Sequence, residues 1–441
     1  VEECIREAGK DHTIRTALVE SGVSAGELGL YHDLIVRFDR DVVRGTGASF
    51  VQAKLEERDQ RLKKQGSSRY LVEPNVKEGK GGLRDLNTLF WITKYVYRFQ
   101  DTSELVEQGV FTPAELALFR RCEDFLWRVR CMMHFNAGRA EDRLSFEMQR
   151  QVATKFRYRP HGGLSAVERF MKHYFLVAKD VGDLTAIVCA ALEAREQKPR
   201  AMLDRMFGGF RRRRRALSGT RDFLIDHDRL TVASDDVFAR DPVNLIRLFW
   251  HAAQNQFELH PDAKRLVTLS LRNIDGRLRA DPEANRLFLD VLTSRSVNEI
   301  VLRRMHETGV LGRFIPDFGR IQSMMQFSSY HHYTVDEHTL RAVGVLAEID
   351  AGRLKDEHPV ANEIFSTLQN RRALYVALFL HDIGKGRGGD HSVVGARIAR
   401  ELCPRLGLTD AETGTVSWLV EHHLLMSNCL LYTSPSPRDR G

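Results

Sequence analysis

The sequence has few cysteines, and no two of them form a CxxC pair. The six are scattered along the 441 residues: Cys4, Cys122, Cys131, Cys189, Cys403 and Cys429. Zinc ribbons and disulfide frameworks need cysteines at short or regular spacings. The pattern therefore argues against both, and it indicates reduced thiols in a cytoplasmic protein.

Long apolar runs are absent as well. No stretch approaches the roughly 18–20 uninterrupted apolar residues of a membrane helix. No positively charged start precedes an apolar segment, so no secretory signal is visible. Hydrophobic residues at 43% and charged residues at 28% are typical of a soluble globular protein. We therefore expect a cytoplasmic protein of two or three domains, without a membrane partner.

A marked charge excess is also missing, because the net charge is only +7, partly concentrated in Arg211–Arg215. A basic run of this kind can bind nucleic acid. No aromatic stacking platform or recognition motif accompanies it, and a solvated turn or a patch facing an acidic partner is the favoured interpretation. Nucleic acid is therefore not an expected partner.

Strand signals are few. The strand-like pieces are Ala17–Val19 and a hairpin around Phe223–Val232. Apolar residues at three- and four-residue spacing predict helices over 113–135, 163–194, 337–350, 371–381, 392–406 and 410–425. The chain also begins inside a helix, at Val1–Ala8. The sequence predicts a mainly α fold, with candidate domain boundaries at Gly208–Gly219 and at Gly312–Ser329.

The C-terminal residues differ from the rest. From about Asn428 the helical periodicity gives way to the segment YTSPSPRD at 432–439. Segments rich in serine and proline are usually disordered linkers. This one interrupts a helix where a catalytic element should follow. We interpret residues 428–441 as an aberrant tail, arising from truncation or from a sequencing artefact, and we suspect the same of the start at Val1.

Histidines recur between His331 and His423. The pair His381-Asp382 directly follows an apolar run, His338 lies early in one predicted helix, and His391 and His423 lie on the two following helices. Capping boxes, in which a threonine and a glutamate three residues later cap a helix start, are predicted at Thr334–Glu337 and Thr409–Glu412.

Imidazole and carboxylate groups from separate helices can share one divalent cation. Such a cation lowers the pKa of its bound water and polarises a phosphoryl oxygen. Mixed nitrogen and oxygen ligands suit Mn, Fe, Zn or Mg. Lys385 and Arg387 follow the pair and could contact a phosphate. A lone His-Asp pair is usually incidental, but four spaced histidines favour a metal site; His331, His332 and His422 are interpreted as neighbours rather than ligands.

Several strings resemble one family within the HD superfamily of metal-dependent phosphohydrolases. In the histidine-rich region they are YHHYTVDEHTL at 330–340, FLHDIGKGRGGDH at 379–391 and WLVEHHLLMS at 418–427. Further strings are EPNVKEGKGGLRD at 73–85, FLWRVR at 125–130, RAEDRL at 139–144 and AVERFM at 166–171. They resemble the bifunctional PII uridylyltransferase/uridylyl-removing enzymes from residue 1 to about 427.

The resemblance implies an enzyme of nitrogen signalling. The family transfers UMP from UTP to a tyrosine of the regulator PII, and its HD domain hydrolyses the uridylyl-tyrosine bond when glutamine, the effector, is abundant. The implied metal is Mg or Mn, with Asp382 and Lys385 as catalytic residues. The implied ligands of the metal are His338, His381, Asp382, His391 and His423.

The resemblance also implies a domain order. Residues 1–40 would be the end of a small α/β nucleotidyltransferase domain, and 41–200 a helical accessory domain. Residues 201–310 would form a linker region with a hairpin and helices. Residues 311–427 would be an all-helical HD domain, followed by the tail at 428–441.

Three departures from the family pattern concern catalysis. No glycine turn with an Asp-x-Asp pair precedes Val1, and Asp39-Arg-Asp41 and Asp226-His-Asp228 are interpreted as structural. Glu20 would be the third carboxylate of that domain. The family's closing aspartate is replaced by the segment at 428–434, with Asp439 too late to serve, and Ser328 stands at a usual aspartate. Without the Asp pair, two-metal phosphoryl transfer lacks its clamp.

The glycine-rich loop at 74–85 allows two interpretations. Its amides, together with Lys77, Lys80 and Arg84, could hold a phosphate or a PII surface, as Arg387 could in the HD domain. Alternatively, the loop caps the helix that begins near Leu83. For the whole chain, the alternatives to a uridylyl-removing enzyme are a catalytically dead PII-binding fragment and an HD phosphohydrolase acting on free nucleotides.

Overall fold

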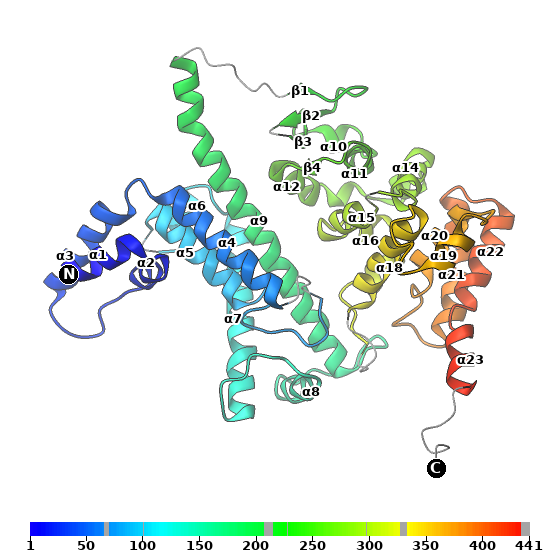
Figure 1. Ribbon diagram of the computed structural model, residues 1–441, viewed down its shortest axis with the longest axis horizontal. Coiled ribbons are helices and arrows are strands. Elements are labelled where there is room, and N and C mark those ends of the chain that lie inside the picture. Colours follow the sequence, from blue (N-terminus) through cyan, green and yellow to red (C-terminus); the bar gives the residue numbers. More distant parts are fainter. Residues whose placement is uncertain are drawn as a thin grey trace. The chain divides into compact units, whose positions relative to one another are not determined.

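The structure is a computed structural model that describes residues 1–65, 70–99, 101–206, 215–226, 228–296, 298–326 and 333–433. The contacts between residues divide the chain into two compact units. Unit 1 comprises Val1–Arg157 and His173–Gly208, and unit 2 comprises Tyr158–Lys172 and Gly209–Gly441. The mainly α class predicted from the sequence is confirmed (Figure 1).

All the named elements of unit 1 are helices. They are α1 (Glu2–Lys10), α2 (His12–Val19), α3 (Leu28–Phe38), the π-helical turn η1 (Asp39–Val43), α4 (Gly47–Gln65), α5 (Leu83–Tyr97), α6 (Glu104–Glu107), α7 (Pro113–Ala137), α8 (Phe146–Lys155) and α9 (Ala166–Met206), whose first turns up to Lys172 belong to unit 2. The strand predicted at Ala17–Val19 is wrong, because these residues form the last turn of α2.

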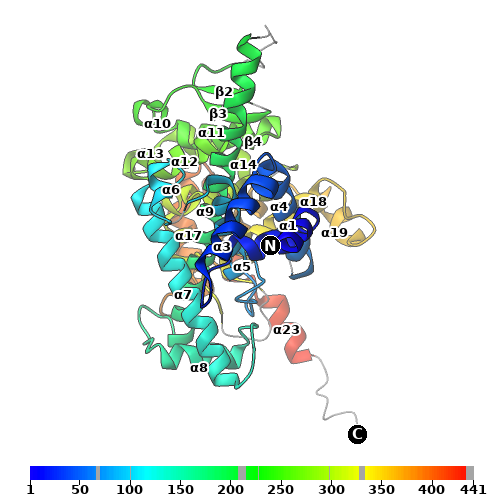
Figure 2. The same ribbon diagram turned by 90° about the vertical axis from the view of Figure 1, so that its left-hand side faces the viewer.

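Helices α4, α5 and α7 pack in sequence, and both views place α8 beside the end of α7 (Figures 1 and 2). The start of α7 is fixed by local chemistry. Thr112 and Glu115 form a reciprocal capping box, and Pro113 occupies the first helical position. Gly138, in the left-handed conformation with φ 64°, ends the helix.

Unit 2 begins with a small sheet of four strands, β1 (Arg215–Ala216), β2 (Phe223–Asp226), β3 (Arg229–Val232) and β4 (Glu258–Leu259), in that order. The predicted hairpin is confirmed: β2 and β3 pair antiparallel, Phe223 opposite Val232. Asp228 takes a positive φ of 58° in the turn. Strand β4 pairs parallel to β3.

The remaining elements of unit 2 are helices. They are α10 (Val237–Arg240), α11 (Asn244–Asn255), α12 (Pro261–Leu269), the 3-10 turn η2 (Leu271–Asn273), α13 (Gly276–Ala280), α14 (Pro282–Leu292), α15 (Asn298–Glu307), α16 (Val310–Phe314), α17 (Pro316–Ile321), α18 (Val335–Asp350), α19 (Pro359–Phe365), α20 (Arg371–Leu380), α21 (His391–Arg405), α22 (Asp410–Glu421) and α23 (Leu425–Thr433).

One hydrophobic core runs through unit 2. It extends from Leu217 beside the sheet to Val420 on α22, and includes the stacked rings of Phe318 and Phe379. Helices α18, α20, α21 and α22 pack against one another at the C-terminal end of this core. Among the described residues, no helix combines the length and the apolar character needed to cross a bilayer.

Candidate metal centre

Helix α20 places His381 and Asp382. Its residues are mostly apolar and buried, and the side chain of Asn370 caps its start by accepting a hydrogen bond from the Ala373 amide. The helix ends at Leu380, directly before the His-Asp pair. Because the helix is fixed in the core, the two side chains that follow it are held at one edge of the helical cluster.

Helix α18 contributes His338 from its first turn. Thr334 is the N-cap residue, but its side chain makes no capping hydrogen bond, so the capping box predicted at Thr334–Glu337 is wrong. The Glu337 carboxylate is fully buried and instead pairs with Arg303 and Arg341. The pair with Arg303 links the first turn of α18 to α15, and the pair with Arg341 lies within α18.

Helix α21 starts at His391, and His423 follows the end of α22. A close approach of two chain segments places His391: a Cβ at Gly384 would lie 2.2 Å from the His391 carbonyl oxygen. Only glycine fits between them, which explains the glycine in the His-Asp-Ile-Gly string. The capping box predicted at Thr409–Glu412 is confirmed at the start of α22.

These helices bring together all five predicted ligands. The ligand atoms of His338, His381 and Asp382 lie within 4.8 Å of one another, and so do those of Asp382, His391 and His423. The Asp382 carboxylate therefore belongs to two groups of three. Its Oδ2 lies 3.2 Å from His381 Nε2, and its Oδ1 lies 3.8 Å from the Nε2 atoms of both His391 and His423.

The orientation of the rings suits a cation. Nδ1 of His381 lies 2.7 Å from the Leu378 carbonyl oxygen, and Nδ1 of His423 lies 2.8 Å from that of Val420. A carbonyl oxygen only accepts, so each neutral ring carries its proton on Nδ1 and its lone pair on Nε2, facing Asp382. His391 Nε2 is buried and has no hydrogen-bond partner. The donor set thus fits a divalent cation.

Charge and burial keep these groups in the required protonation states. Burial acts to raise the pKa of Asp382, but the interaction with the His381 ring 3.2 Å away and the charge of Lys385 outweigh it, and its pKa lies well below the usual range. Burial lowers the pKa of both His391 and His423. At neutral pH the centre therefore combines a carboxylate with two imidazoles that need no deprotonation.

Lys385 is held beside the carboxylate. Its buried ammonium donates to Asp382 Oδ2 and to Gln326 Oε1, both at 2.8 Å. No sequence pattern indicated Gln326, which lies 59 residues away on a different segment. Arg387, predicted to contact phosphate, is ion-paired with Asp317 of α17.

The described residues around the centre correct one prediction. Helical structure continues through α23 to Thr433, so the predicted loss of helix from Asn428 is wrong. His422 is exposed and lies edge-to-face with Trp418, with ring centroids 5.0 Å apart. Ser328, His331, His332, Asp439 and most of the basic run at 211–215 lie outside the described residues.

The aspartates of the two Asp-x-Asp strings lie in local structure. Asp39 pairs with Arg98 at 3.0 Å and Asp41 pairs with Arg40 at 2.6 Å, within and beside the turn η1. Asp226 and Asp228 flank the turn of the β2–β3 hairpin. Glu20 is exposed at the end of α2.

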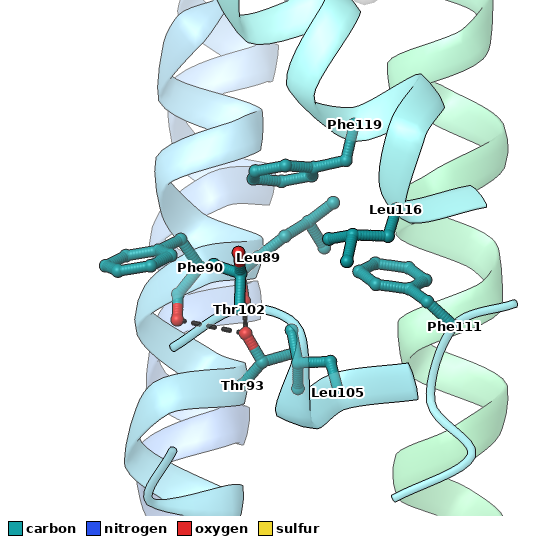
Figure 3. Close-up of a pocket in the computed structure, with 8 residues that line it drawn as sticks. All are labelled: Leu89, Phe90, Thr93, Thr102, Leu105, Phe111, Leu116 and Phe119. Atoms are coloured by element: carbon teal, nitrogen blue, oxygen red, sulfur yellow. Dashed lines mark hydrogen bonds between the residues drawn. The ribbon is translucent and has the colours of Figure 1, made fainter. Parts of the chain in front are cut away.

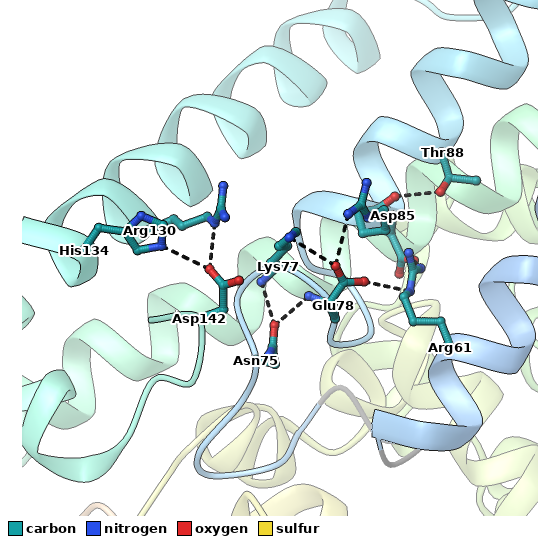
Figure 4. A network of polar contacts seen from close by, with 10 residues as sticks. Arg61, Asn75, Lys77, Glu78, Asp85, Thr88, Arg130, His134 and Asp142 are labelled. Atoms are coloured by element: carbon teal, nitrogen blue, oxygen red, sulfur yellow. Dashed lines mark hydrogen bonds and ion pairs between the residues drawn. The ribbon is translucent and has the colours of Figure 1, made fainter. Parts of the chain in front are cut away.

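The backbone amides of the glycine-rich loop of unit 1 donate hydrogen bonds within the loop itself (Figure 4). The amides of Lys77 and Glu78 donate to Asn75 Oδ1, and that of Gly79 donates to the Asn75 carbonyl oxygen. The Gly81 amide donates to the buried Asp85 carboxylate at 2.8 Å. A phosphate would have to replace these bonds, so the contacts favour the structural interpretation of the loop.

The charged side chains of this loop are also paired. Glu78 lies 3.6 Å from Lys77 and 3.2 Å from Arg84, and Lys80 is partly buried. A Cβ at Gly81 would lie 2.3 Å from the Ala178 carbonyl oxygen of α9. The glycine therefore permits close packing of the loop on α9, which accounts for its presence without a ligand.

An apolar cavity in unit 1 is too small for a substrate. It measures about 10 Å³ and lies among α5, α6 and α7 (Figure 3). Its walls are Leu89, Phe90, Thr93, Thr102, Leu105, Phe111, Leu116 and Phe119. A space that barely admits one water between such side chains is a packing defect.

Three family models match the sequence. Residues 49–189 match the GlnD PII-uridylyltransferase, residues 223–314 match the third domain of uridylyltransferase GlnD, and residues 335–439 match the HD domain. The two GlnD models together span more than half of the chain. The HD match contains all five residues of the metal centre and Lys385.

Proposed function

Because the chain belongs to the GlnD family of PII uridylyltransferase/uridylyl-removing enzymes, we propose that its HD domain hydrolyses the phosphodiester that links UMP to PII. The observation that supports this proposal is the convergence of four imidazoles on the single buried carboxylate of Asp382. Phosphodiester hydrolysis needs a hydroxide at neutral pH and positive charge near the phosphoryl oxygens.

His338, His381, Asp382, His391 and His423 would hold the cation, with Mg or Mn as the proposed metal. A bound cation of this kind supplies a low-pKa water and a Lewis acid. Because Asp382 belongs to both groups of ligand atoms, its carboxylate would be a ligand whichever group held the cation.

The chain's own residues supply the remaining requirements. Lys385 keeps Asp382 charged and oriented through its hydrogen bond of 2.8 Å. Its ammonium also places positive charge beside the centre, where phosphoryl oxygens of a substrate would bind. Arg387 is held by Asp317 and would act at the edge of the site.

The wider role of the family is also proposed for this chain. Its protein partner would be PII in a cytoplasmic nitrogen-signalling system, with UTP as the substrate of the opposing uridylylation and glutamine as the effector. Of the two reactions, the described residues favour hydrolysis over uridylylation. The carboxylates of the two Asp-x-Asp strings already form local ion pairs or flank a hairpin turn: Asp39, Asp41, Asp226 and Asp228.

A second candidate function is PII binding without hydrolysis. Helix α23 follows the metal centre, and its nine residues, Leu425–Thr433, include no carboxylate. The resemblance implies a closing aspartate soon after residue 427, where this chain has the segment at 428–434 instead. If the ligand set lacks it, the affinity for the metal falls, and the chain would bind PII without hydrolysing its ester.

The test is UMP release from uridylylated PII by the purified chain. After treatment with EDTA, the protein is assayed with Mn²⁺, with Mg²⁺ and without metal. We expect release only with metal. PII binding without metal uptake or release would establish the second candidate function. Hydrolysis of free nucleotides, with uridylylated PII left intact, would instead refute the assignment to PII.

A further inference from the structure

The segment Tyr158–Lys172 belongs to unit 2, although it lies in the middle of the sequence of unit 1. It includes the residues before α9 and the first turns of that helix. The match to the PII-uridylyltransferase family, at 49–189, covers it entirely. A part of the chain outside the HD match, at 335–439, therefore packs with the unit that holds the metal centre.

One point of this segment contacts the turn that carries Lys385. Gly163 has a φ of 84°, and a Cβ there would lie 3.0 Å from the Gly386 carbonyl oxygen. Gly386 also packs against the Met324 side chain, because a Cβ at Gly386 would lie 2.3 Å from Met324 Cε. The backbone of Gly386, between Lys385 and Arg387, thus lies close to both Gly163 and Met324.

Further contacts fix the segment itself. Leu164 packs against the core of unit 2. The Lys172 ammonium donates to the Arg320 carbonyl oxygen on α17 at 3.1 Å, and Asp317 of the same helix pairs with Arg387. Within the segment, the Arg169 guanidinium donates to the Arg159 carbonyl oxygen at 2.5 Å.

We infer that the segment Tyr158–Lys172 positions the Lys385–Arg387 turn, with Gly163 as the contact point. The inference rests on the proposed hydrolase function of that turn. The segment lies within the match to the PII-uridylyltransferase family. The inference gives it a role in the opposing reaction, the hydrolysis that removes UMP. Gly163 is a positioning residue, because it acts on Lys385 through the backbone of Gly386.

Neighbouring glycines provide a matched test. Gly162 has a φ of 61°, and a Cβ added there would have no neighbouring atom within 4 Å, whereas one at Gly163 would face Gly386. Gly162→Ala and Gly163→Ala introduce the same side chain at left-handed positions, but only the second pushes on the turn. We expect kcat for UMP release from uridylylated PII to fall about tenfold or more in Gly163→Ala. Gly162→Ala should stay within about twofold of the parent chain, which separates backbone strain from displacement of the turn.

Hydrogen exchange gives a readout that does not depend on activity. The amides of residues 383–388 should exchange faster in Gly163→Ala than in Gly162→Ala, with Mn²⁺ uptake equal in both. Gly163→Asn and Gly162→Asn form a second pair, because asparagine tolerates positive φ better than alanine and preserves the fold.

Equal exchange in the two members of a pair would overturn the inference, and so would equal kcat values. An inactive parent chain would refute the proposed function instead. In that case the exchange comparison alone decides whether the segment positions the turn.

Discussion

At the scale of single residues, a proposed metal ligand differs from an adjacent histidine in the position of its ring nitrogen atoms. His422 and His423 are adjacent in the chain. His423 is half-buried, with Nδ1 on the Val420 carbonyl oxygen and Nε2 3.8 Å from Asp382 Oδ1. His422 is exposed and contacts Trp418 edge-to-face. The pair therefore offers a test in which the residue type and the local chain are the same.

His423→Ala should weaken Mn²⁺ binding at least tenfold, roughly the loss that follows disruption of residues around a metal. His422→Ala should leave the affinity within about twofold of the parent chain. Isothermal titration of the EDTA-treated proteins measures both. Equal affinities in the two variants would show that His423 does not bind the metal.

The sequence predicted which side chains gather around Asp382, but not the residues that support Lys385 and Arg387. A His-Asp pair after an apolar helix, with histidines near the ends of neighbouring helices, indicates a metal site because each residue lies where a helix begins or ends. Gln326 and Asp317 carry no such signal. They reach Lys385 and Arg387 across 59 and 70 residues, and only the packing of α17 and the chain after it brings them there.

At the scale of elements, the start of α22 is tied to α20. Glu412 caps the helix with Thr409, and the Arg372 guanidinium on α20 pairs with the Glu412 carboxylate at 2.6 Å. The hydrogen bonds from Arg372, followed by those from Thr409, lower the pKa of Glu412 from 4.5 to about 2. The folded state thus favours the deprotonated form more strongly than the unfolded chain does.

This depressed pKa makes part of the free energy of unfolding depend on pH. The contribution is complete above about pH 4.5 and is lost as the pH falls toward about 2. Because Arg372 is partly exposed, we expect roughly 1 kcal/mol. Urea unfolding at several pH values should show a shallower decline between pH 4.5 and 2 in Glu412→Gln than in the parent chain. Parallel declines would contradict the assignment.

The sequence correctly predicted helices where one face is apolar over several turns, as in α7, α20 and α21. Short segments were less well determined. Ala17–Val19 has strand-like composition but continues α2, because Val19 packs in the small core with Phe38 and Phe50. Glu337 fits a capping box by spacing, yet Arg303 and Arg341 draw its carboxylate away. In both cases tertiary contacts outweigh the local preference.

At the scale of the whole molecule, the metal centre is part of a core that extends across unit 2, from Leu217 to Val420. The proposed ligands come from α18, α21 and the ends of α20 and α22, so a bound cation would link four regions of one core. Free energy from metal binding should therefore stabilise unit 2 as a whole rather than one helix.

Calorimetry can test this coupling. Mn²⁺ at about 100 times its Kd should stabilise the folded state by roughly 2.7 kcal/mol. We expect this shift in the transition of unit 2, and we expect EDTA to reverse it. In Asp382→Asn the shift should be absent, because the carboxylate that belongs to both groups of ligand atoms is removed. A metal-induced shift that persists in Asp382→Asn would mean that the stabilising ion binds elsewhere, and the cluster around Asp382 would then be a polar feature of the core.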